Sequence, residues 1–264
     1  MAPRDSDRVL LRSATLAKWG FSHGFSTRKG GVSPPPYDTC DFAMLRDPEA
    51  LRENLARFGQ RVGFDPARLY QATQVHGAAV LEAGGDAASA RAVEADAVVA
   101  SAPGDAAAVR VADCVPVLVA DPATGRVAAI HAGWKGVVGR VVEAGLRSLG
   151  GGAERVAAIG PCIGSCCFEV STEVGRAIEA AAGAPGVRAP DHAPGKCKVD
   201  LRAAVRAQLV ALGLDDANVE DVPPAEGCTR CEAEWFYSFR RDGDASGRLL
   251  AAIVAGRNVD PSGR

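Results

Sequence analysis

Two short apolar runs joined by a compact turn constrain the fold of this chain more than any other segment. Residues 115–120 and 126–130 flank the sequence Asp-Pro-Ala-Thr-Gly, which has proline early and glycine late, as tight turns do. We therefore predict an antiparallel hairpin. If the first turn residue pairs with the residue that follows the turn, His131 faces Pro116, and Cys114 becomes its diagonal neighbour on the same face of the sheet.

The predicted hairpin brings a cysteine and a histidine within reach of one metal ion. Diagonal neighbours have Cα atoms about 7–8 Å apart, so their side chains can converge. The segment Gln-Val-His-Gly at 74–77 offers a third ligand, His76. Two imidazoles and one thiolate leave one position open on a tetrahedral zinc ion, which is typical of a catalytic site. The alternative interpretation is three unrelated buried residues, because free cysteine also packs as a small hydrophobe.

Charge and hydropathy exclude several classes of protein. The formal net charge of −2 over 264 residues gives no basic excess for binding nucleic acid. No run approaches the roughly 20 apolar residues of a membrane span, so we expect no membrane partner. The N-terminal residues lack the apolar core of a signal peptide, which favours a cytoplasmic location. Residues 1–7 are expected to be disordered, and the oligomeric state stays open.

Helices are predicted where a capping residue precedes a periodic apolar pattern. Asp47, followed by proline, begins one that extends to residue 62, and others are expected over about 137–149, from Ser171 to near 183, and from Asp200 to 213. Short apolar segments between them are typical of strands. Because strands and helices mix throughout without a linker-like break, we predict a single α/β (α+β) domain with a mixed sheet over residues 1–264.

Six motifs occur in an order that matches a known family. They are Phe25-Ser-Thr-Arg-Lys-Gly-Gly-Val-Ser33, Gln74-Val-His-Gly77, Ala112-Asp-Cys-Val-Pro-Val117, His131-Ala-Gly-Trp-Lys-Gly136, Gly160-Pro-Cys-Ile-Gly-Ser-Cys-Cys-Phe-Glu-Val170 and Ser238-Phe-Arg-Arg-Asp-Gly243. Over roughly residues 20–255 the chain resembles the YfiH-like family, also called the laccase-domain or multicopper polyphenol oxidase family, the purine nucleoside phosphorylase family and the peptidoglycan editing factor family.

The resemblance implies a fold, a metal and an activity. The fold is a single-domain α/β/β/α layered sandwich, and the metal is zinc bound by His76, Cys114 and His131, with Cu²⁺ as another ion that the same site would accept. The implied activity is phosphorolysis of adenosine, inosine, guanosine or S-methyl-5'-thioadenosine, together with deamination of adenosine. The expected partners are therefore small molecules, a purine nucleoside and phosphate.

Catalytic and anion-binding roles follow from the same motifs. Cys114 and His131 are the expected catalytic ligands. By motif position, the carboxylates of Asp113 and Glu169 are candidates for proton transfer. The candidates for phosphate binding are the cations Arg28, Lys135 and Arg240. Arg28 is favoured among the cations because it precedes Gly-Gly, whose backbone can approach an anion closely.

Three positions depart from the family pattern. Lys135 stands where the family usually has arginine. Lysine keeps the positive charge but cannot donate two parallel hydrogen bonds to one phosphate, as a guanidinium can. Asp41 stands where the family has asparagine, which puts a ligand contact from that loop in doubt. Cys162 stands where the family commonly has a small apolar residue.

Other cysteines and histidines allow competing interpretations. Cys228 and Cys231, paired with Cys162 and Cys166, would make a four-cysteine zinc site. The family-like loops instead favour Cys166 and Cys228 near the substrate pocket. His23 is expected to be a hydrogen-bonded structural residue rather than a lining residue of the site.

Two rival activities remain from sequence. A copper-dependent polyphenol oxidase would need many histidines as copper ligands, and the four histidines of this chain argue against it. A cysteine or metal hydrolase that edits peptidoglycan precursors would use Cys114 as nucleophile and His131 as base.

Overall fold

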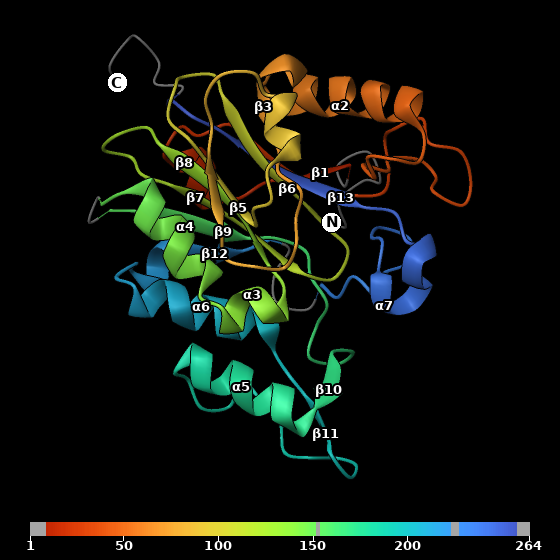
Figure 1. The fold of residues 1–264 in the computed structure, drawn as a ribbon, viewed down its shortest axis with the longest axis vertical. Helices are drawn as coiled ribbons and strands as arrows, with labels where there is room; N and C mark the ends of the chain where they lie inside the picture. The colour runs from red at the N-terminus through yellow and green to blue at the C-terminus, as the bar shows by residue number, and fades with distance from the viewer. Residues whose placement is uncertain (1–8, 152–153, 223–226, 258–264) are drawn as a thin grey trace, which may run out of the picture.

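Two mixed β-sheets stack face to face, with helices on both outer surfaces (Figure 1). The computed structural model describes residues 9–151, 154–222 and 227–257, so the predicted disorder of residues 1–7 lies outside the described residues. The first sheet has the order β1 (Leu10–Leu11), β2 (His23–Ser26), β13 (Leu249–Val254), β6 (Ala106–Val111), β3 (Leu69–Tyr70). The second has the order β12 (Val219–Asp221), β9 (Val156–Ile159), β7 (Val115–Ala120), β8 (Val127–Ala132), β5 (Ala97–Ala100), β4 (Val80–Glu82).

Each sheet has its own helical cover. Helix α2 (Pro48–Val62) packs on the outer face of the first sheet, and α3 (Trp134–Val138), α4 (Val141–Leu149), α5 (Thr172–Ala182) and α6 (Leu201–Ala211) lie on the side of the second. A two-stranded ribbon pairs β10 (Glu169–Ser171) with β11 (Lys196–Lys198). The remaining helices are α1 (Ala14–Lys18), α7 (Phe239–Asp242) and the 3-10 turns Pro66–Arg68, Ser89–Ala92, Asp216–Asn218 and Gly243–Ala245. The layered α/β/β/α sandwich with mixed sheets is therefore confirmed.

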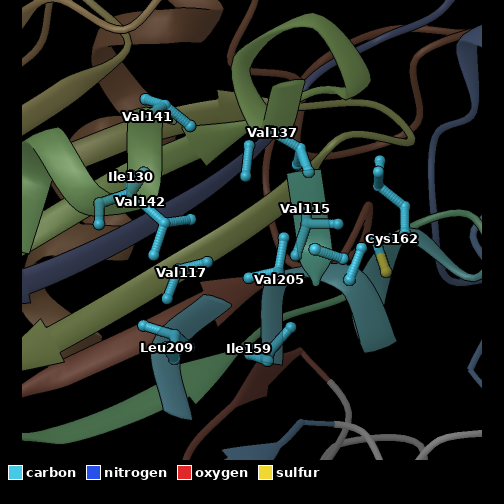
Figure 2. Close-up of a cluster of buried hydrophobic side chains, with 14 of the residues drawn as sticks. Val115, Val117, Ile130, Val137, Val141, Val142, Ile159, Cys162, Val205 and Leu209 are labelled. Carbon is cyan, nitrogen blue, oxygen red and sulfur yellow. The ribbon is translucent and has the colours of Figure 1, made fainter. Parts of the chain in front are cut away.

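Alternation along β7 explains why both faces of its sheet are buried. Val115, Val117 and Val119 point to the helices, whereas Leu118 points to the core between the sheets. Figure 2 shows the helix-side cluster, which also contains Cys162. The sequence of β7 is a continuous apolar run because neither face of the strand is exposed to water.

The hairpin register is the predicted one. Pro116 pairs with His131, and the amide of Asp121 donates to the carbonyl of Arg126 at 2.9 Å. The Asp121 carboxylate accepts from the amide of Ala123 at 2.9 Å, which fixes the turn. The turn chemistry therefore positions the histidine as the sequence indicated.

Capping residues place most helices correctly, with one difference. Asp47, Ser171 and Asp200 each accept a hydrogen bond from the first turn of their helix. The single helix expected over about 137–149 is instead two. Helix α3 ends at Val138 with Gly139 as its C-cap, and Arg140 takes the left-handed backbone at φ 65° before α4 begins. Within the described residues, no helix combines the length and apolar character that crossing a bilayer requires.

His23 is a buried structural residue of β2. Its Nδ1 donates to the carbonyl of Phe21 at 2.8 Å, and its Nε2 accepts from the amide of Ser13 at 2.8 Å. Burial lowers the pKa of His23, aided by the charge of Arg12 and opposed by that of Glu220. Protonation would remove the acceptor that the Ser13 amide needs.

The protein should lose stability as pH falls below the ordinary histidine value of 6.5, because the lowered pKa of His23 favours its neutral form in the folded state. The contribution is complete above that pH and is lost in acid. Chemical unfolding at pH 7.5 and 5.5 measures it, and His23→Gln should flatten this difference. His192→Gln, which changes an exposed histidine, is the control; equal pH dependence in the wild type and His23→Gln would contradict the assignment.

Candidate metal centre

Three side chains from distant segments meet at one end of the hairpin. His131 lies in β8, Cys114 immediately precedes β7, and His76 lies in the loop between β3 and β4. Their donor atoms all lie within 4.8 Å of one another, and the two imidazole rings have centroids 4.9 Å apart. His131 is buried, Cys114 is half-buried and His76 is exposed, so the group opens to solvent on one side.

Asp96 organises this group and was missed by the sequence analysis. Its carboxylate is fully buried and accepts from His131 Nδ1 at 2.7 Å and from the amides of His76 at 2.9 Å and Gly77 at 2.6 Å. The bond to Nδ1 leaves His131 Nε2 as the ligand atom, and carboxylates commonly orient metal-binding histidines in this way. The available signal was an acidic residue next to the apolar strand β5.

The charges in the group support one another. Burial by itself would raise the pKa of Cys114, but the positive charge of His131 and hydrogen bonds from both histidines outweigh it and lower that pKa. Burial likewise opposes protonation of His131, while the Cys114 thiolate and Asp96 raise its pKa. Without an ion, the Cys114 thiolate therefore pairs with a protonated His131, and a thiophilic cation would bind by displacing the proton from His131 Nε2.

The donor set fits zinc. Two nitrogen donors and one sulfur donor leave one tetrahedral position for water or substrate. Gly133 permits the close approach, since a Cβ there would lie 3.0 Å from Cys114 Sγ and 3.0 Å from His76 Cδ2. The backbone of His76 has φ 62° and is held by the Asp96 carboxylate.

Asp113 is a positioning residue in this geometry. Its Oδ1 accepts from the Thr229 hydroxyl at 2.6 Å, and its Oδ2 accepts from the Ser238 hydroxyl at 3.0 Å and the Arg240 amide at 2.6 Å. Its backbone is left-handed, at φ 89°. The carboxylate thus ties two distant loops to the residue preceding Cys114.

Glu169 lies on the surface at the start of β10. Its Oε2 lies 2.8 Å from His192 Nε2, and its carbonyl accepts from Arg240 Nη1 at 2.9 Å. Hydrogen bonding to His192 lowers the pKa of Glu169. Within residues 9–151, 154–222 and 227–257, no hydrogen bond or ion pair joins Glu169 to the three metal-capable residues.

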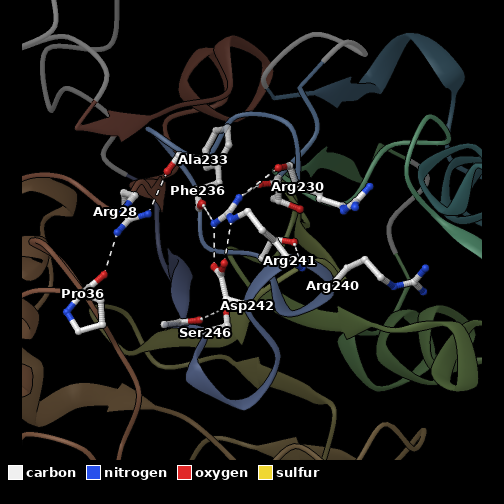
Figure 3. A network of polar contacts seen from close by, with 12 residues as sticks. Arg28, Pro36, Arg230, Ala233, Phe236, Arg240, Arg241, Asp242 and Ser246 are labelled. Atoms are coloured by element: carbon white, nitrogen blue, oxygen red, sulfur yellow. Dashed lines mark hydrogen bonds and ion pairs between the residues drawn. The ribbon is translucent and has the colours of Figure 1, made fainter.

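The candidate phosphate-binding cations differ in how they are held. Arg28 donates through Nε, Nη1 and Nη2 to the carbonyls of Asp38, Ala233 and Pro36, which uses three of its five N–H groups. Figure 3 shows Arg28 and Arg240 on opposite sides of Arg241, so they do not face one another. Lys135 is exposed, and its ammonium lies 5.9 Å from the centre of the Trp134 ring.

Asp41, which departs from the family pattern, has a structural role. Its carboxylate accepts from the amides of Arg248 at 2.7 Å and Ala43 at 3.0 Å, and it pairs with Arg46 at 3.0 Å. The side chain is buried, so the negative charge is compensated locally.

A second group of sulfur atoms lies outside the first. The thiols of Cys166, Cys167, Cys228 and Cys231 all lie within 4.8 Å of one another and could hold a metal ion. Cys162 is not among them, because it is buried in the helix-side core. The four-cysteine set considered from the sequence was therefore wrong in one residue. Cys167, and not Cys162, joins Cys166, Cys228 and Cys231.

Comparisons with known proteins cover almost the whole chain. A family model described as multi-copper polyphenol oxidoreductase laccase matches residues 22–256. A purine nucleoside phosphorylase of Deinococcus radiodurans is 37% identical over 260 residues, which is 96% of this chain and 96% of that protein. Adenosine deaminase RL5, from an unknown prokaryotic organism, is 41% identical over 144 residues, which is 53% of this chain and 54% of that protein.

The fold is also shared with a solved structure. The crystal structure of the Bacillus licheniformis hypothetical protein YfiH matches with a TM-score of 0.84 at 27% identity, covering 96% of this chain and 98% of that chain. The similarity therefore extends over nearly the whole length of both chains.

Proposed function

The chain belongs to the family described as multi-copper polyphenol oxidoreductase laccase, as its six motifs predicted, and we propose that it is a zinc-dependent purine nucleoside phosphorylase. Its substrates would be adenosine, inosine, guanosine and S-methyl-5'-thioadenosine, with adenosine deamination as a second activity. The observation that carries the proposal is the convergence of His76, Cys114 and His131 in a chain that aligns almost end to end with a purine nucleoside phosphorylase.

Zinc would be held by His76, Cys114 and His131. When bound, it supplies Lewis acidity and activates water at neutral pH, which is the chemistry that deamination needs. Asp96 keeps His131 oriented through its Nδ1 and fixes the backbone that carries His76. Cu²⁺ would bind the same donors, because raw affinity favours it over zinc.

Phosphorolysis requires a phosphate oxygen to form a bond to the anomeric carbon while the bond to the purine nitrogen breaks. The base leaves with that electron pair, and the sugar passes through an oxocarbenium-like state. We assign the phosphate to Arg28, whose two remaining N–H groups suit its oxygens. Lys135 and Arg240 are alternative cations for the phosphate, because Arg240 does not face Arg28. Lys135 has no ion pair within the described part of the chain, so its charge is available to an anion.

Deamination also needs a group that moves a proton. Of the two carboxylates, Asp113 accepts three structural hydrogen bonds, whereas Glu169 keeps Oε1 without a donor among the described residues. We therefore assign proton transfer to Glu169 and positioning of the Cys114 segment to Asp113.

A multicopper oxidase fits the donor set poorly. Several copper ions need many histidines, and the chain has four. His23 is committed to the Ser13 amide and the Phe21 carbonyl, and His192 contacts Glu169. The remaining two histidines both belong to the single group with Cys114.

Purified protein should convert adenosine and phosphate to adenine and ribose 1-phosphate. Lys135→Ala removes a cation whose ammonium makes no hydrogen bond to the residues that the structure describes, and Arg28→Ala removes the favoured one. Each should raise the KM for phosphate, by roughly tenfold to a hundredfold for a charge-assisted contact worth about 1.5–3 kcal/mol, with little change in nucleoside KM.

Arg57→Ala, which removes an arginine paired with Glu53 on α2, is the matched control. Adenine release at the same rate without phosphate or a substitute anion would identify a hydrolase and contradict the proposal.

A further inference from the structure

We propose that Cys166, Cys167, Cys228 and Cys231 form a second metal site, a tetrathiolate site that binds one zinc ion. The proposal rests on the placement of the sulfur atoms. The Sγ–Sγ separations are 3.6 Å for Cys166 with Cys167, 3.8 Å for Cys166 with Cys231 and 3.3 Å for Cys167 with Cys231. A zinc tetrahedron with Zn–S bonds of about 2.3 Å has sulfur atoms about 3.8 Å apart.

The two loops that carry these residues have the local geometry of metal-binding turns. Cys228 and Cys231 have the Cys-x₂-Cys spacing of zinc ligands, and the amides of Cys231 and Glu232 donate to the Cys228 carbonyl at 3.1 and 3.0 Å. In the other loop, the amides of Cys167 and Phe168 donate to the Gly164 carbonyl at 2.9 and 3.0 Å. The thiols of the two turns therefore converge, with all four sulfur atoms within 4.8 Å of one another.

Polar groups around the sulfur atoms suit thiolates rather than thiols. The Gly164 amide donates to Cys228 Sγ at 3.2 Å, and Arg230 Nη1 donates to Cys167 Sγ at 3.6 Å. Lys198 Nζ lies 2.8 Å from the Cys166 carbonyl, so a second cation is close. Four thiolates around a divalent cation carry a net charge of −2, and the Arg230 guanidinium beside Cys167 Sγ offsets part of it.

Gly164 favours this packing, because a side chain there would push the neighbouring cysteines by a few tenths of an ångström. A Cβ at that position would lie 3.2 Å from Cys228 Cβ and 3.3 Å from Cys166 Sγ. Glycine therefore lets the backbone of this loop approach Cys228 of the other loop closely.

The four sulfur atoms are too close together for an iron–sulfur cluster, which places several atoms between its cysteines, so a single ion fits. A tetrahedral set of four sulfur donors selects zinc among abundant divalent ions. The ion would also hold Thr229, whose hydroxyl donates to Asp113, in the loop beside Cys114. The second site would thus support the first one through Thr229 and Asp113 without taking part in the proposed reaction itself.

The test counts zinc by elemental analysis in protein purified with reductant and without chelator. The wild type should carry two zinc ions per chain, Cys114→Ser one, and the double variant Cys166→Ala with Cys231→Ala one. Cys40→Ala, which changes a buried cysteine outside both groups, should keep two. One zinc ion in the wild type and none in Cys114→Ser would overturn the proposal.

Cobalt substitution provides a second readout that leaves the cluster intact. Cys114→Ser loaded with Co²⁺ should show the strong sulfur-to-cobalt absorption of a tetrathiolate site, and the additional change of Cys166 and Cys231 to alanine should abolish it. Absence of this absorption in folded Cys114→Ser, or a Cys167–Cys231 disulfide found by mass spectrometry in the freshly purified protein, would contradict a zinc site at these residues.

Discussion

Cys114→Ser is expected to release the zinc ion from the first group and to lower the turnover of adenosine by about a thousandfold or more. A serine hydroxyl is a poor zinc ligand beside two imidazoles, so the affinity of the site falls. Losing a Lewis acid removes several kcal/mol of transition-state stabilisation, and each 1.36 kcal/mol or so is a factor of ten in rate. Elemental analysis and steady-state kinetics on the same preparation measure both effects.

Alkylation of Cys114 in the wild-type protein separates a metal enzyme from a cysteine hydrolase. A zinc-bound thiolate should resist iodoacetamide until the metal is stripped, and activity should disappear together with the metal. A nucleophilic Cys114 activated by His131 would instead be alkylated rapidly in zinc-loaded protein. Peptide mass mapping before and after chelation distinguishes them, and full activity after complete chelation would favour the hydrolase.

Asp96→Asn is expected to weaken zinc binding by about tenfold to a hundredfold, which is the usual effect of losing a carboxylate that orients a metal-binding histidine. The amide keeps the shape of the side chain but not the negative charge that faces His131 Nδ1 at 2.7 Å. Competition with a chromophoric chelator measures the change in zinc affinity.

Asp121→Asn is the matched control for this effect. Asp121 is also a buried aspartate, but it accepts from the Ala123 amide and the Thr124 hydroxyl in the hairpin turn rather than from the site. Equal zinc affinity in Asp96→Asn and the wild type would contradict the role of Asp96 in orienting the zinc-binding histidine.

The parts of the fold that were predictable depend on local patterns. The turn between β7 and β8 fixes its own register through backbone and Asp121 contacts, so His131 and Cys114 could be placed from the sequence. Capping residues fixed helix starts for the same reason. The break between α3 and α4 was not predicted, because the left-handed conformation of Arg140 carries no clear residue signal.

The parts of the site that sequence reasoning missed depend on contacts between distant segments. The Asp96 carboxylate accepts hydrogen bonds from His131 Nδ1 and from the His76 amide. These three residues are far apart in the sequence, and only the folded sheet brings them together. The contacts of Arg28 could not be predicted either, because its guanidinium donates to backbone carbonyls, which every residue type carries. Cys162 is close in sequence to Cys166, yet it points into the helix-side core while Cys167 joins the sulfur group.

The most direct test of the proposed reaction follows the fate of phosphate. Zinc-loaded protein is incubated with adenosine and phosphate labelled with phosphorus-32, and the sugar products are separated. We expect labelled ribose 1-phosphate in an amount equal to the adenine released, because phosphorolysis transfers the ribosyl group to phosphate. Adenine released together with unlabelled ribose, or no purine base released while phenols are oxidised, would contradict the account.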